Sequence, residues 1–503
     1  MVLKEVFALE QIGFPILSLL LFLPVLVIIL LHFTRTEKLV YPIALLGAVA
    51  ELVLASILAF AFVPNVADVQ FVEQLGPIPW LGVSYHLGVD GINILFVPVT
   101  ALLTVLVVIY AEYAAKADAR RYLMATLALH ATMIGAFVSL DLVLFWIFFV
   151  LELVPSYYLI TRWGTGANRE RAAREYVTFM LAGSALMLAG IIALGVNAHA
   201  HAGEVSFDYV ELLRAPVASE LQTIVFFLMF FGFAVKAPVF PFHTWMPKVL
   251  EEGPVVGMSV FLVGLKLGTY GFIRFLIPLL PDAAHRWAWL MLSLGVAGML
   301  YGAVIALVQT NLRRLLAFSS LSHMGVVMLG LFAFNHYGLQ GGLLQMINLG
   351  ITGAGLYFVA GFLYSRIGPP DLSAMGGLVE RAPWLTAAYL IIALAGVGLP
   401  GTGGFNGEHL VMLGGLQVHW AIAVAAGVGT FLTACYFLWF FLQGFIGSPS
   451  AGLAPKLPDL RFRERLIGIA LGFMIFWIGL DTIPFLRAMS GSLRAVEQMV
   501  GAR

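Results

Sequence analysis

The stretch Phe231-Gly-Phe-Ala-Val-Lys-Ala-Pro-Val-Phe-Pro-Phe-His-Thr-Trp-Met-Pro247 determines how this chain is interpreted. It begins inside a long apolar run, carries Lys236 in the middle and follows it with Pro238 and Pro241. Each proline removes a backbone donor and clashes with the preceding turn, so a helix here is predicted to break. A lysine at bilayer depth is costly and marks ion or proton paths. A broken membrane helix is tolerated only against protein or a water-filled cavity. The stretch therefore predicts a transport site.

The composition places the whole chain in a membrane. Of its 503 residues, 61% are hydrophobic and only 11% are charged, whereas ordinary soluble domains are about 45–50% apolar and about 25% charged. The sequence therefore predicts an all-α polytopic membrane protein surrounded by lipid. The net charge of zero says nothing about nucleic acid, but no basic patch with interleaved aromatic residues is present, so no nucleic acid is expected as a partner. The single cysteine, Cys435, excludes a disulfide and a cysteine-ligated iron–sulfur cluster within the chain.

The apolar runs predict about 14 transmembrane helices, because a span needs about 20 apolar residues. Basic residues such as Arg35, Arg162 and Arg313 follow odd-numbered spans, so one face of the protein takes nearly all the positive charge. An even number of spans then places both termini on the opposite, outer side. The predicted helices start near residues 12, 40, 88, 121, 141, 174, 220, 255, 287, 315, 341, 383, 418 and 465.

Two of the predicted spans are interrupted, and they are five spans apart. The seventh is broken after Lys236, and the twelfth carries Pro400 within a glycine-rich run from Gly396 to Gly407. A repeat with an odd period has inverted topology, and inverted repeats with broken helices are a recurrent plan of transporters. We therefore predict four parts: residues 1–120 with helices 1–3, residues 121–280 as repeat one with helices 4–8, residues 281–445 as repeat two with helices 9–13, and residues 446–503 with helix 14 and a tail.

Other charged residues lie inside predicted spans. Asp141 starts the fifth span, where its carboxylate is expected to cap free N–H groups. Glu152 lies eleven residues deeper, and Lys266 lies about ten residues from either end of the eighth span, too central to reach the interface easily. Arg274 is closer to the end and is expected to reach it. Lysine suits a proton path because burial lowers a lysine pKa and a nearby carboxylate raises it, whereas arginine stays protonated.

The tenth and twelfth spans add two more protonatable groups. The tenth contains Ser319-Ser-Leu-Ser-His323-Met-Gly325, in which a histidine lies among small residues and hydroxyl groups. A histidine can carry protons near neutral pH when other polar groups surround it, although a hydrogen-bonded core histidine is as common. Glu408 ends the interrupted twelfth span and is the carboxylate expected at the far end of the path.

Two tempting patterns carry no function. Gly396-x-Gly398-x-x-Gly401 fits a dinucleotide-loop expression, but no βαβ unit surrounds it. His199 and His201 are expected in an outer loop and have no further ligands at metal spacing, so no metal site is predicted.

Several motifs together are similar to one known family. They run in the same order as in the antiporter-like subunits of respiratory complex I, subunit M above all, and the resemblance covers roughly residues 85–445. The motifs are Val235-Lys-x-Pro-x-x-Pro-x-His-Thr-Trp-x-Pro247, Leu265-Lys-Leu-Gly-Thr-Tyr-Gly271, Asn311-Leu-Arg-Arg-Leu-Leu-Ala-Phe-Ser-Ser320, Ser322-His-Met-Gly325, and Gly398-Leu-Pro-Gly401 followed by Glu408.

The resemblance implies a proton-translocating membrane-arm subunit of a quinone oxidoreductase complex, built from two inverted five-helix repeats. Such a subunit has no redox cofactor of its own; iron–sulfur clusters and flavin, or another electron-input module, are expected in partner subunits. The implied partners are other membrane-arm subunits. The implied location is a bacterial inner membrane or a thylakoid membrane.

The resemblance also implies roles for individual residues. Lys236 would be the central lysine of the broken seventh helix and would pair with a fifth-helix glutamate, here Glu152. Lys266 and His323 would link two half-channels, and Glu408 would be the terminal residue of the path. The supporting residues of the breaks would be Pro238, Pro241, His243 and Pro400.

Three positions depart from the family pattern. The family glutamate occupies the position of Val150, two residues before Glu152, and two residues turn a helix by about 200°. Glu152 is therefore expected to face Lys236 only if the helix bulges or packs differently. Leu349 replaces a family histidine, and Lys248 replaces an aspartate. These changes indicate a diverged paralogue, and the candidates are the variant used in cyanobacterial carbon-dioxide-uptake complexes, membrane-hydrogenase-type complexes and unusual quinone-linked complexes.

Two other interpretations stay open. A subunit of a multi-chain sodium/proton antiporter would share the ancestral fold and need no electron donor. A structural scaffold with a lost channel would also explain Val150 and Leu349.

Overall fold

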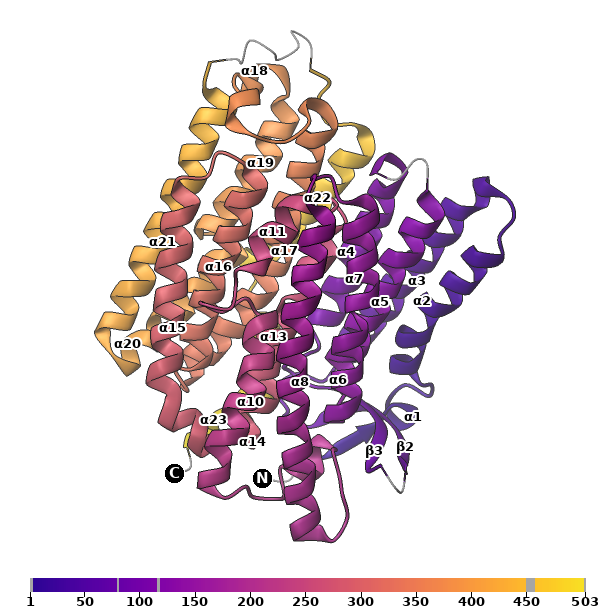
Figure 1. The fold of residues 1–503 in the computed structure, drawn as a ribbon, viewed down its shortest axis with the longest axis vertical. Helices are drawn as coiled ribbons and strands as arrows, with labels where there is room; N and C mark the ends of the chain where they lie inside the picture. Colours follow the sequence, from indigo (N-terminus) through magenta and orange to yellow (C-terminus); the bar gives the residue numbers. More distant parts are fainter. Residues whose placement is uncertain (1–2, 79–80, 115–117, 449–456, 502–503) are drawn as a thin grey trace.

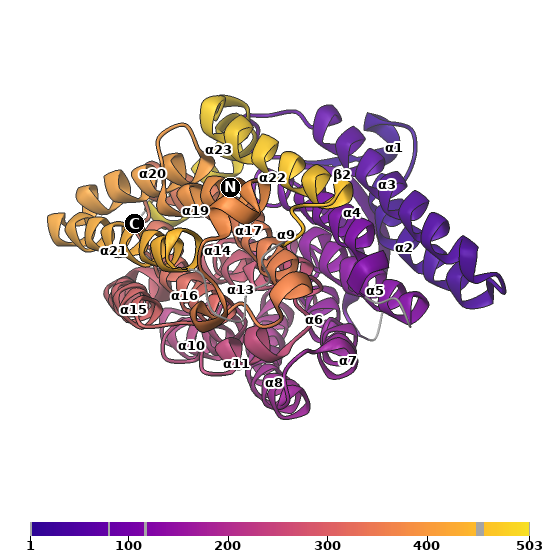
Figure 2. The ribbon, with the colours of Figure 1, turned by 90° about the horizontal axis from the view of Figure 1, so that it is seen from above.

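A computed structural model of the chain describes residues 3–78, 81–114, 118–448 and 457–501. Long helices lie side by side and form the body of the molecule, and a small β-sheet lies at one end (Figure 1). Both ends of the chain lie at this sheet end. Seen from above, α2 and α3 lie at one flank and α20 and α21 at the opposite flank (Figure 2).

The first part of the chain contains the sheet and four long helices. In the sheet the strand order is β1-β2-β3, with β1 parallel to β2 and β2 antiparallel to β3. The elements are β1 Glu5–Phe7, α1 Ala8–Gln11, α2 Ile16–Phe33, α3 Glu37–Ala61, β2 Val69–Ile78, β3 Val83–Val89, α4 Phe96–Ala114 and α5 Ala119–Val138.

The middle of the chain contains most of the interrupted helices. A π-helix, η1, continues α13 towards the sheet end. The elements are α6 Leu142–Leu151, α7 Leu153–Trp163, α8 Arg169–Ala202, α9 Tyr209–Leu212, α10 Ser219–Lys236, α11 Trp245–Glu252, α12 Met258–Gly264, α13 Lys266–Gly271, η1 Phe272–Leu276 and α14 Ile277–Leu279.

The last part begins with three long helices and contains the second interrupted pair, α19 and α20. The elements are α15 Pro281–Leu307, α16 Leu312–Leu331, α17 His336–Ile367, η2 Leu372–Ala374, α18 Leu378–Arg381, α19 Pro383–Val397, α20 Gly403–Val418, α21 Trp420–Phe441, η3 Leu442–Ile446, α22 Phe462–Leu480 and α23 Ile483–Gly501.

The polytopic α-helical class is confirmed. Among the described residues, 11 helices are long and apolar enough to cross a membrane, or up to 12 if α22 and α23, bent by 68°, are counted as one span. Phe96–Glu112 and Pro383–Val397 are shorter apolar helices. The count of about 14 and the division into four parts stay predictions. The two predicted breaks are present, between α10 and α11 and between α19 and α20.

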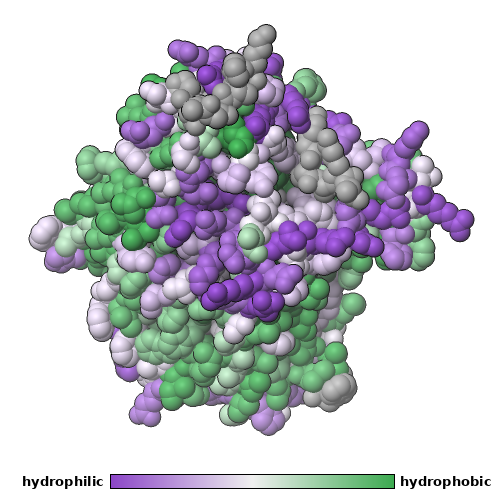
Figure 3. All heavy atoms as spheres, turned by 45° about the horizontal axis from the view of Figure 1, so that its top comes forward, coloured by the Kyte–Doolittle hydropathy of each residue, from purple (hydrophilic) through white to green (hydrophobic). Residues whose placement is uncertain are grey.

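Polar and apolar surfaces separate along the long axis. Hydrophilic residues gather at the end that carries α18, and hydrophobic residues cover the sides below it (Figure 3). Arg162 and Arg314 lie exposed at this end, which we call the basic face. Its charge agrees with the side of the membrane predicted to take the basic loops.

Four elements differ from the prediction. The strands β2 and β3 form where an all-α chain was predicted, and the third helix begins at Phe96 rather than near residue 88. Helix α8 extends to Ala202, so His199 and His201 lie in its last turn and not in a loop. The tail forms a separate helix, α23, that packs against α14, α15 and α17. Short apolar runs are compatible with either helix or strand, which explains the error at the sheet.

The sheet is held to the helices by close backbone contact and by one histidine. Gly82 has φ +65°, and a Cβ there would lie 2.2 Å from the carbonyl oxygen of Val205. The ring of His86 on β3 lies between two carboxylates: Nδ1 contacts Asp208 and Nε2 is 3.2 Å from Glu5 Oε1. Burial by itself would lower the pKa of His86, but hydrogen bonds and charges of Asp208 and Glu5 raise it to about 9.

Stability should therefore depend on the protonation of His86. Because the folded-state pKa is raised from 6.5 to about 9, the stabilisation is complete below pH 6.5 and is lost as pH rises through about 9. We expect His86→Gln to lower the unfolding free energy at pH 7 by about 1.5–3 kcal/mol. We also expect the variant to lose most of the wild-type decrease in thermal midpoint between pH 7 and pH 10. The exposed His199→Gln is the control, and parallel pH curves for wild type and His86→Gln would contradict the assignment.

Candidate functional site

The break after α10 is built by its two prolines and closed by new hydrogen bonds. Helix α10 ends at Lys236, and α11 begins nine residues later at Trp245. The Val239 N–H donates to the Ala234 carbonyl at 2.9 Å, and the Trp245 indole N–H donates to the Val235 carbonyl at 3.0 Å. Backbone groups that the prolines would leave unpaired in lipid are thus satisfied inside the protein.

His243 lies in this break but makes an aromatic contact rather than an ionic one. Its ring stacks on Phe240 at 5.7 Å between centroids and meets Tyr301 at 5.3 Å. His243 therefore supports the shape of the break.

Lys236 forms a buried ion pair with Glu152. Lys236 Nζ is 2.8 Å from Glu152 Oε2, and both side chains are 0% exposed. Aromatic rings surround the ammonium: Phe149 at 5.5 Å and Tyr176 and Phe261 at 5.9 Å from ring centroid to Nζ. Ring faces attract a cation, so they add to the stabilisation by the carboxylate.

Glu152 lies at the junction of α6 and α7. Helix α6 ends at Leu151 and α7 begins at Leu153, but Glu152 between them keeps α-helical dihedral angles, φ −55° and ψ −27°, and its N–H donates to the Phe148 carbonyl at 3.1 Å. Pro155 has no N–H to donate to the Leu151 carbonyl four residues earlier, so one hydrogen bond is missing beside this junction. Val150 is only half-buried, whereas Glu152 is fully buried. Glu152, and not the residue at position 150, therefore makes the contact with Lys236.

Gly264 provides the space for the Glu152 carboxylate. A Cβ at Gly264 would lie 2.5 Å from Glu152 Oε1 and 3.2 Å from its Cδ. The sequence analysis did not single out this glycine, although its position two residues before a buried lysine was an available signal.

Lys266 begins α13, and Leu265 between α12 and α13 keeps α-helical dihedral angles, φ −60° and ψ −28°. Its helix packs tightly on the first break: a Cβ at Gly268 would lie 2.5 Å from Ala237 N, directly after Lys236. Lys266 lines a cavity of about 20 Å³ together with Ser319 and His323. A cavity of this size has room for about one water molecule.

His323 lines this cavity and contacts Glu408. His323 Nε2 is 3.7 Å from Glu408 Oε1 and 3.0 Å from the Gly396 carbonyl oxygen. Gln345 Nε2 donates to Glu408 Oε1 at 3.3 Å, and the Thr430 hydroxyl donates to Glu408 Oε2 at 2.8 Å. Sequence reasoning missed Gln345 and Thr430, because they come from other helices and carry no local signal.

The second break holds Glu408 near His323. Helix α19 ends at Val397, Gly398 takes φ +81°, and α20 begins at Gly403, with Pro400 in between. Glu408 lies in the second turn of α20, not at the end of the span as expected. Asn348 Nδ2 donates to the Gly403 carbonyl at 2.6 Å and ties the break to α17. Leu349, which replaces a family histidine, lines the cavity beside Lys266.

The protonatable residues therefore form one row through the buried middle of the molecule. Glu152 and Lys236 form its first group, and Lys266, His323 and Glu408 form its second. Helix α13 joins the two groups, because it begins with Lys266 and packs against the break that follows Lys236.

Two neighbouring polar features lie outside the row. Arg274 is 1% exposed and donates to Asp90 Oδ2 at 2.6 Å. It is therefore buried and does not reach the membrane interface, contrary to the prediction.

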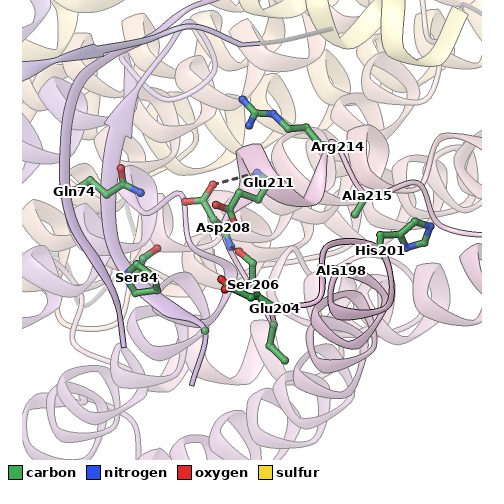
Figure 4. A pocket seen from close by; sticks show the side chains of 13 residues that line it. Gln74, Ser84, Ala198, His201, Glu204, Ser206, Asp208, Glu211, Arg214 and Ala215 are labelled. Carbon is green, nitrogen blue, oxygen red and sulfur yellow. Dashed lines mark hydrogen bonds between the residues drawn. The ribbon is translucent and has the colours of Figure 1, made fainter. Parts of the chain in front are cut away.

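A hollow of about 400 Å³ lies at the sheet end, beside Ser84, Asp208 and Arg214 (Figure 4). Asp141 and Asp208 cap helices near this end, and the predicted Asp141 cap is confirmed by bonds from Val143 and Leu144 N–H at 2.9 and 3.0 Å.

Gly264→Ala should disturb the ion pair without changing any charge. The added methyl group must displace the Glu152 carboxylate, and overpacking of this kind costs about 1–3 kcal/mol of unfolding free energy. Gly353→Ala is the matched control, since its Cβ would meet only Leu262 Cδ1 at an ordinary 3.7 Å. Unfolding of the purified protein measures both variants. Equal stability of the two would show that Glu152 does not need the space at Gly264.

Comparison with known proteins places the chain in a family. Residues 139–433 match the family described as "NADH:quinone oxidoreductase/Mrp antiporter, TM". NADH-quinone oxidoreductase subunit M of Rickettsia prowazekii is 34% identical, over 93% of this chain and 95% of that one. Subunit M of Pseudomonas aeruginosa is 37% identical, over 84% of each chain.

Solved structures show the same fold. A chain of respiratory complex I from Thermus thermophilus superposes with a TM-score of 0.88 at 30% identity, covering 96% of this chain and all of that one. A chain of the Mrp complex from Dietzia sp. DQ12-45-1b has a TM-score of 0.84 at 22% identity, covering 97% and 99% of the two chains. The chain therefore belongs to the transmembrane NADH:quinone oxidoreductase/Mrp antiporter family, with subunit M of NADH-quinone oxidoreductase among its relatives.

Proposed function

We propose that the protein is a proton-translocating membrane-arm subunit of a redox-driven quinone oxidoreductase complex. The observation that carries the proposal is the ion pair of Lys236 and Glu152, fully buried beside a broken helix. Uncompensated charges do not persist in such surroundings, and intramembrane ionisable groups mark proton relays. The relatives' names, NADH-quinone oxidoreductase subunit M, support the redox-driven setting.

In the proposed mechanism, protons move along the row by opening and closing the ion pair. While the pair is closed, Glu152 holds the Lys236 ammonium in place. Separation of the two side chains leaves a charged ammonium without its partner, which favours release of a proton towards Lys266. The cavity beside Lys266 and His323 then offers a place for a bridging water, and Glu408 is the last acceptor in the row.

The proposal places the source of energy outside this chain. Partner subunits would hold the iron–sulfur clusters and flavin, or another electron-input module. Electron transfer in them would change the electric field at Glu152 and Lys236. Other membrane-arm subunits would lie beside this chain in the bilayer. The changes at Val150 and Leu349 support a specialised member of the family.

A sodium/proton antiporter subunit is the second candidate, because the same family includes antiporter chains and the Mrp chain shares the fold. It is distinguished by sodium-dependent proton movement in vesicles without any redox substrate. A scaffold without a channel is the third, although the structure keeps all five residues of the row buried.

Removing the central ammonium should stop pumping. In membranes that carry the complete complex, we expect Lys236→Ala to lower NADH-driven proton translocation by roughly 100-fold, a typical loss when a proton-transfer group is removed. Lys248→Ala is the control, because Lys248 lies on α11 with its side chain 53% exposed beside Glu175. A pH-sensitive dye follows translocation. Normal pumping by both Lys236→Ala and Glu408→Ala would favour the scaffold.

A further inference from the structure

A second buried ionisable pair lies outside the row described above. Glu51 of α3 and His130 of α5 are 1% and 0% exposed, and His130 Nε2 is 3.4 Å from Glu51 Oε2. The other ring nitrogen, Nδ1, is 3.0 Å from the hydroxyl of Thr104 on α4. Three neighbouring helices thus each contribute one polar side chain to this cluster.

The cluster is not a fully satisfied structural pair. Glu51 Oε1 is buried and has no hydrogen-bond partner among the residues that the structure describes. A buried polar atom is normally paired, and a carboxylate inside an apolar bundle is costly to keep. An apolar residue at position 51 would avoid that cost, so the carboxyl group calls for a functional explanation.

Polar side chains on α5 connect the cluster to the basic face. Tyr122, Thr126 and His130 are four residues apart and therefore lie along one side of the helix. Tyr122 lines a cavity of about 340 Å³ at the basic face, together with Trp163 and Thr165. Helix α5 begins at that face, so the three side chains lead from the cavity into the bundle.

The same side of α5 leads on to Glu152. Met133 lies one turn beyond His130, and its Sδ is 3.3 Å from the point that a Cβ on Gly264 would occupy. Glu152 Oε1 is 2.5 Å from that same point. One helical turn is about 5.4 Å along the axis. Met133, one turn beyond His130 on α5, therefore reaches the space at Gly264 that the Glu152 carboxylate also contacts.

We infer that Glu51 and His130 form a proton-holding station on an entry route from the basic face to the Glu152–Lys236 pair. The inference rests on the proposed function and adds to it a route of supply. A proton that enters the cavity beside Tyr122 passes to the His130–Glu51 pair, which holds it as one added charge. It then moves past Met133 to the Glu152 carboxylate once Lys236 has released its own proton. The His130–Glu51 pair then returns to its starting state. Each cycle takes up one proton at the basic face and releases one proton from Lys236.

The decisive variant removes the proton-carrying ability of Glu51 but keeps its shape. Glu51→Gln retains a side chain that can hydrogen-bond to His130, yet an amide does not carry the proton. In membranes with the complete complex, we expect NADH-driven proton translocation to fall roughly tenfold, at an unchanged thermal midpoint. Glu51→Asp should keep most of the rate, because a carboxyl group remains. A merely structural role would give the opposite order, since glutamine preserves the packing better than aspartate.

Glu37→Gln is the matched control, because Glu37 lies on the same helix with its side chain 77% exposed. Lys236→Ala is measured alongside. Wild-type pumping by Glu51→Gln together with loss of pumping by Lys236→Ala overturns the entry route and leaves the proposed function standing. Normal pumping by Lys236→Ala overturns the proposed function itself.

Variants at His130 cover the case in which Glu51→Gln does not assemble. His130→Gln and the double variant Glu51→Gln/His130→Gln are then measured, and at least a roughly tenfold loss of pumping by an assembled variant is expected. Failure of all three to assemble, or normal pumping by an assembled one, shows that the pair only braces α3 against α5 and overturns the inference.

Discussion

The structure depends on one buried contact, the 2.8 Å ion pair between Lys236 and Glu152. Neither charge is stable alone in a bundle of apolar helices. Removing one unpaired ion from water costs on the order of several kcal/mol. The two residues come from helices 84 positions apart in sequence number, so the contact exists only in the assembled bundle. Three aromatic rings complete the surroundings of the ammonium.

Two broken helices and two helix junctions carry the charges. Breaks follow Lys236 and precede Glu408, whereas Glu152 and Lys266 lie at the junctions α6/α7 and α12/α13, where the backbone dihedral angles stay helical. An unbroken helix pairs all its backbone groups internally, whereas an interruption frees groups that bind side chains or water. Glycines permit the close approach at these points, and Gly264 is the one that leaves room for the carboxylate. The result is a row in which polar groups meet inside an otherwise apolar core.

Sequence reasoning identified the features that have local signals. The membrane class and both breaks followed from apolar runs and prolines, and Lys236 and Glu408 stood out as charges within such runs. Whether Glu152 could face Lys236 stayed open, because that contact depends on how two helices far apart in the sequence pack. The Glu51–His130 cluster was missed altogether, since its members pair only across helices and neither lies in a recognisable motif. The sheet was missed because a short apolar run does not distinguish a strand from a loop or helix.

A double-mutant cycle on Glu152 and Lys236 tests most directly whether the two charges depend on one another. We expect Glu152→Gln and Lys236→Met each to lower the unfolding free energy by about 3–5 kcal/mol, because each leaves a buried charge unpaired. The double variant leaves no charge behind, so its loss should be far smaller than the sum of the single losses. Single effects that add to within about 0.5 kcal/mol would show that the two residues are energetically independent, and would contradict the central role of their contact.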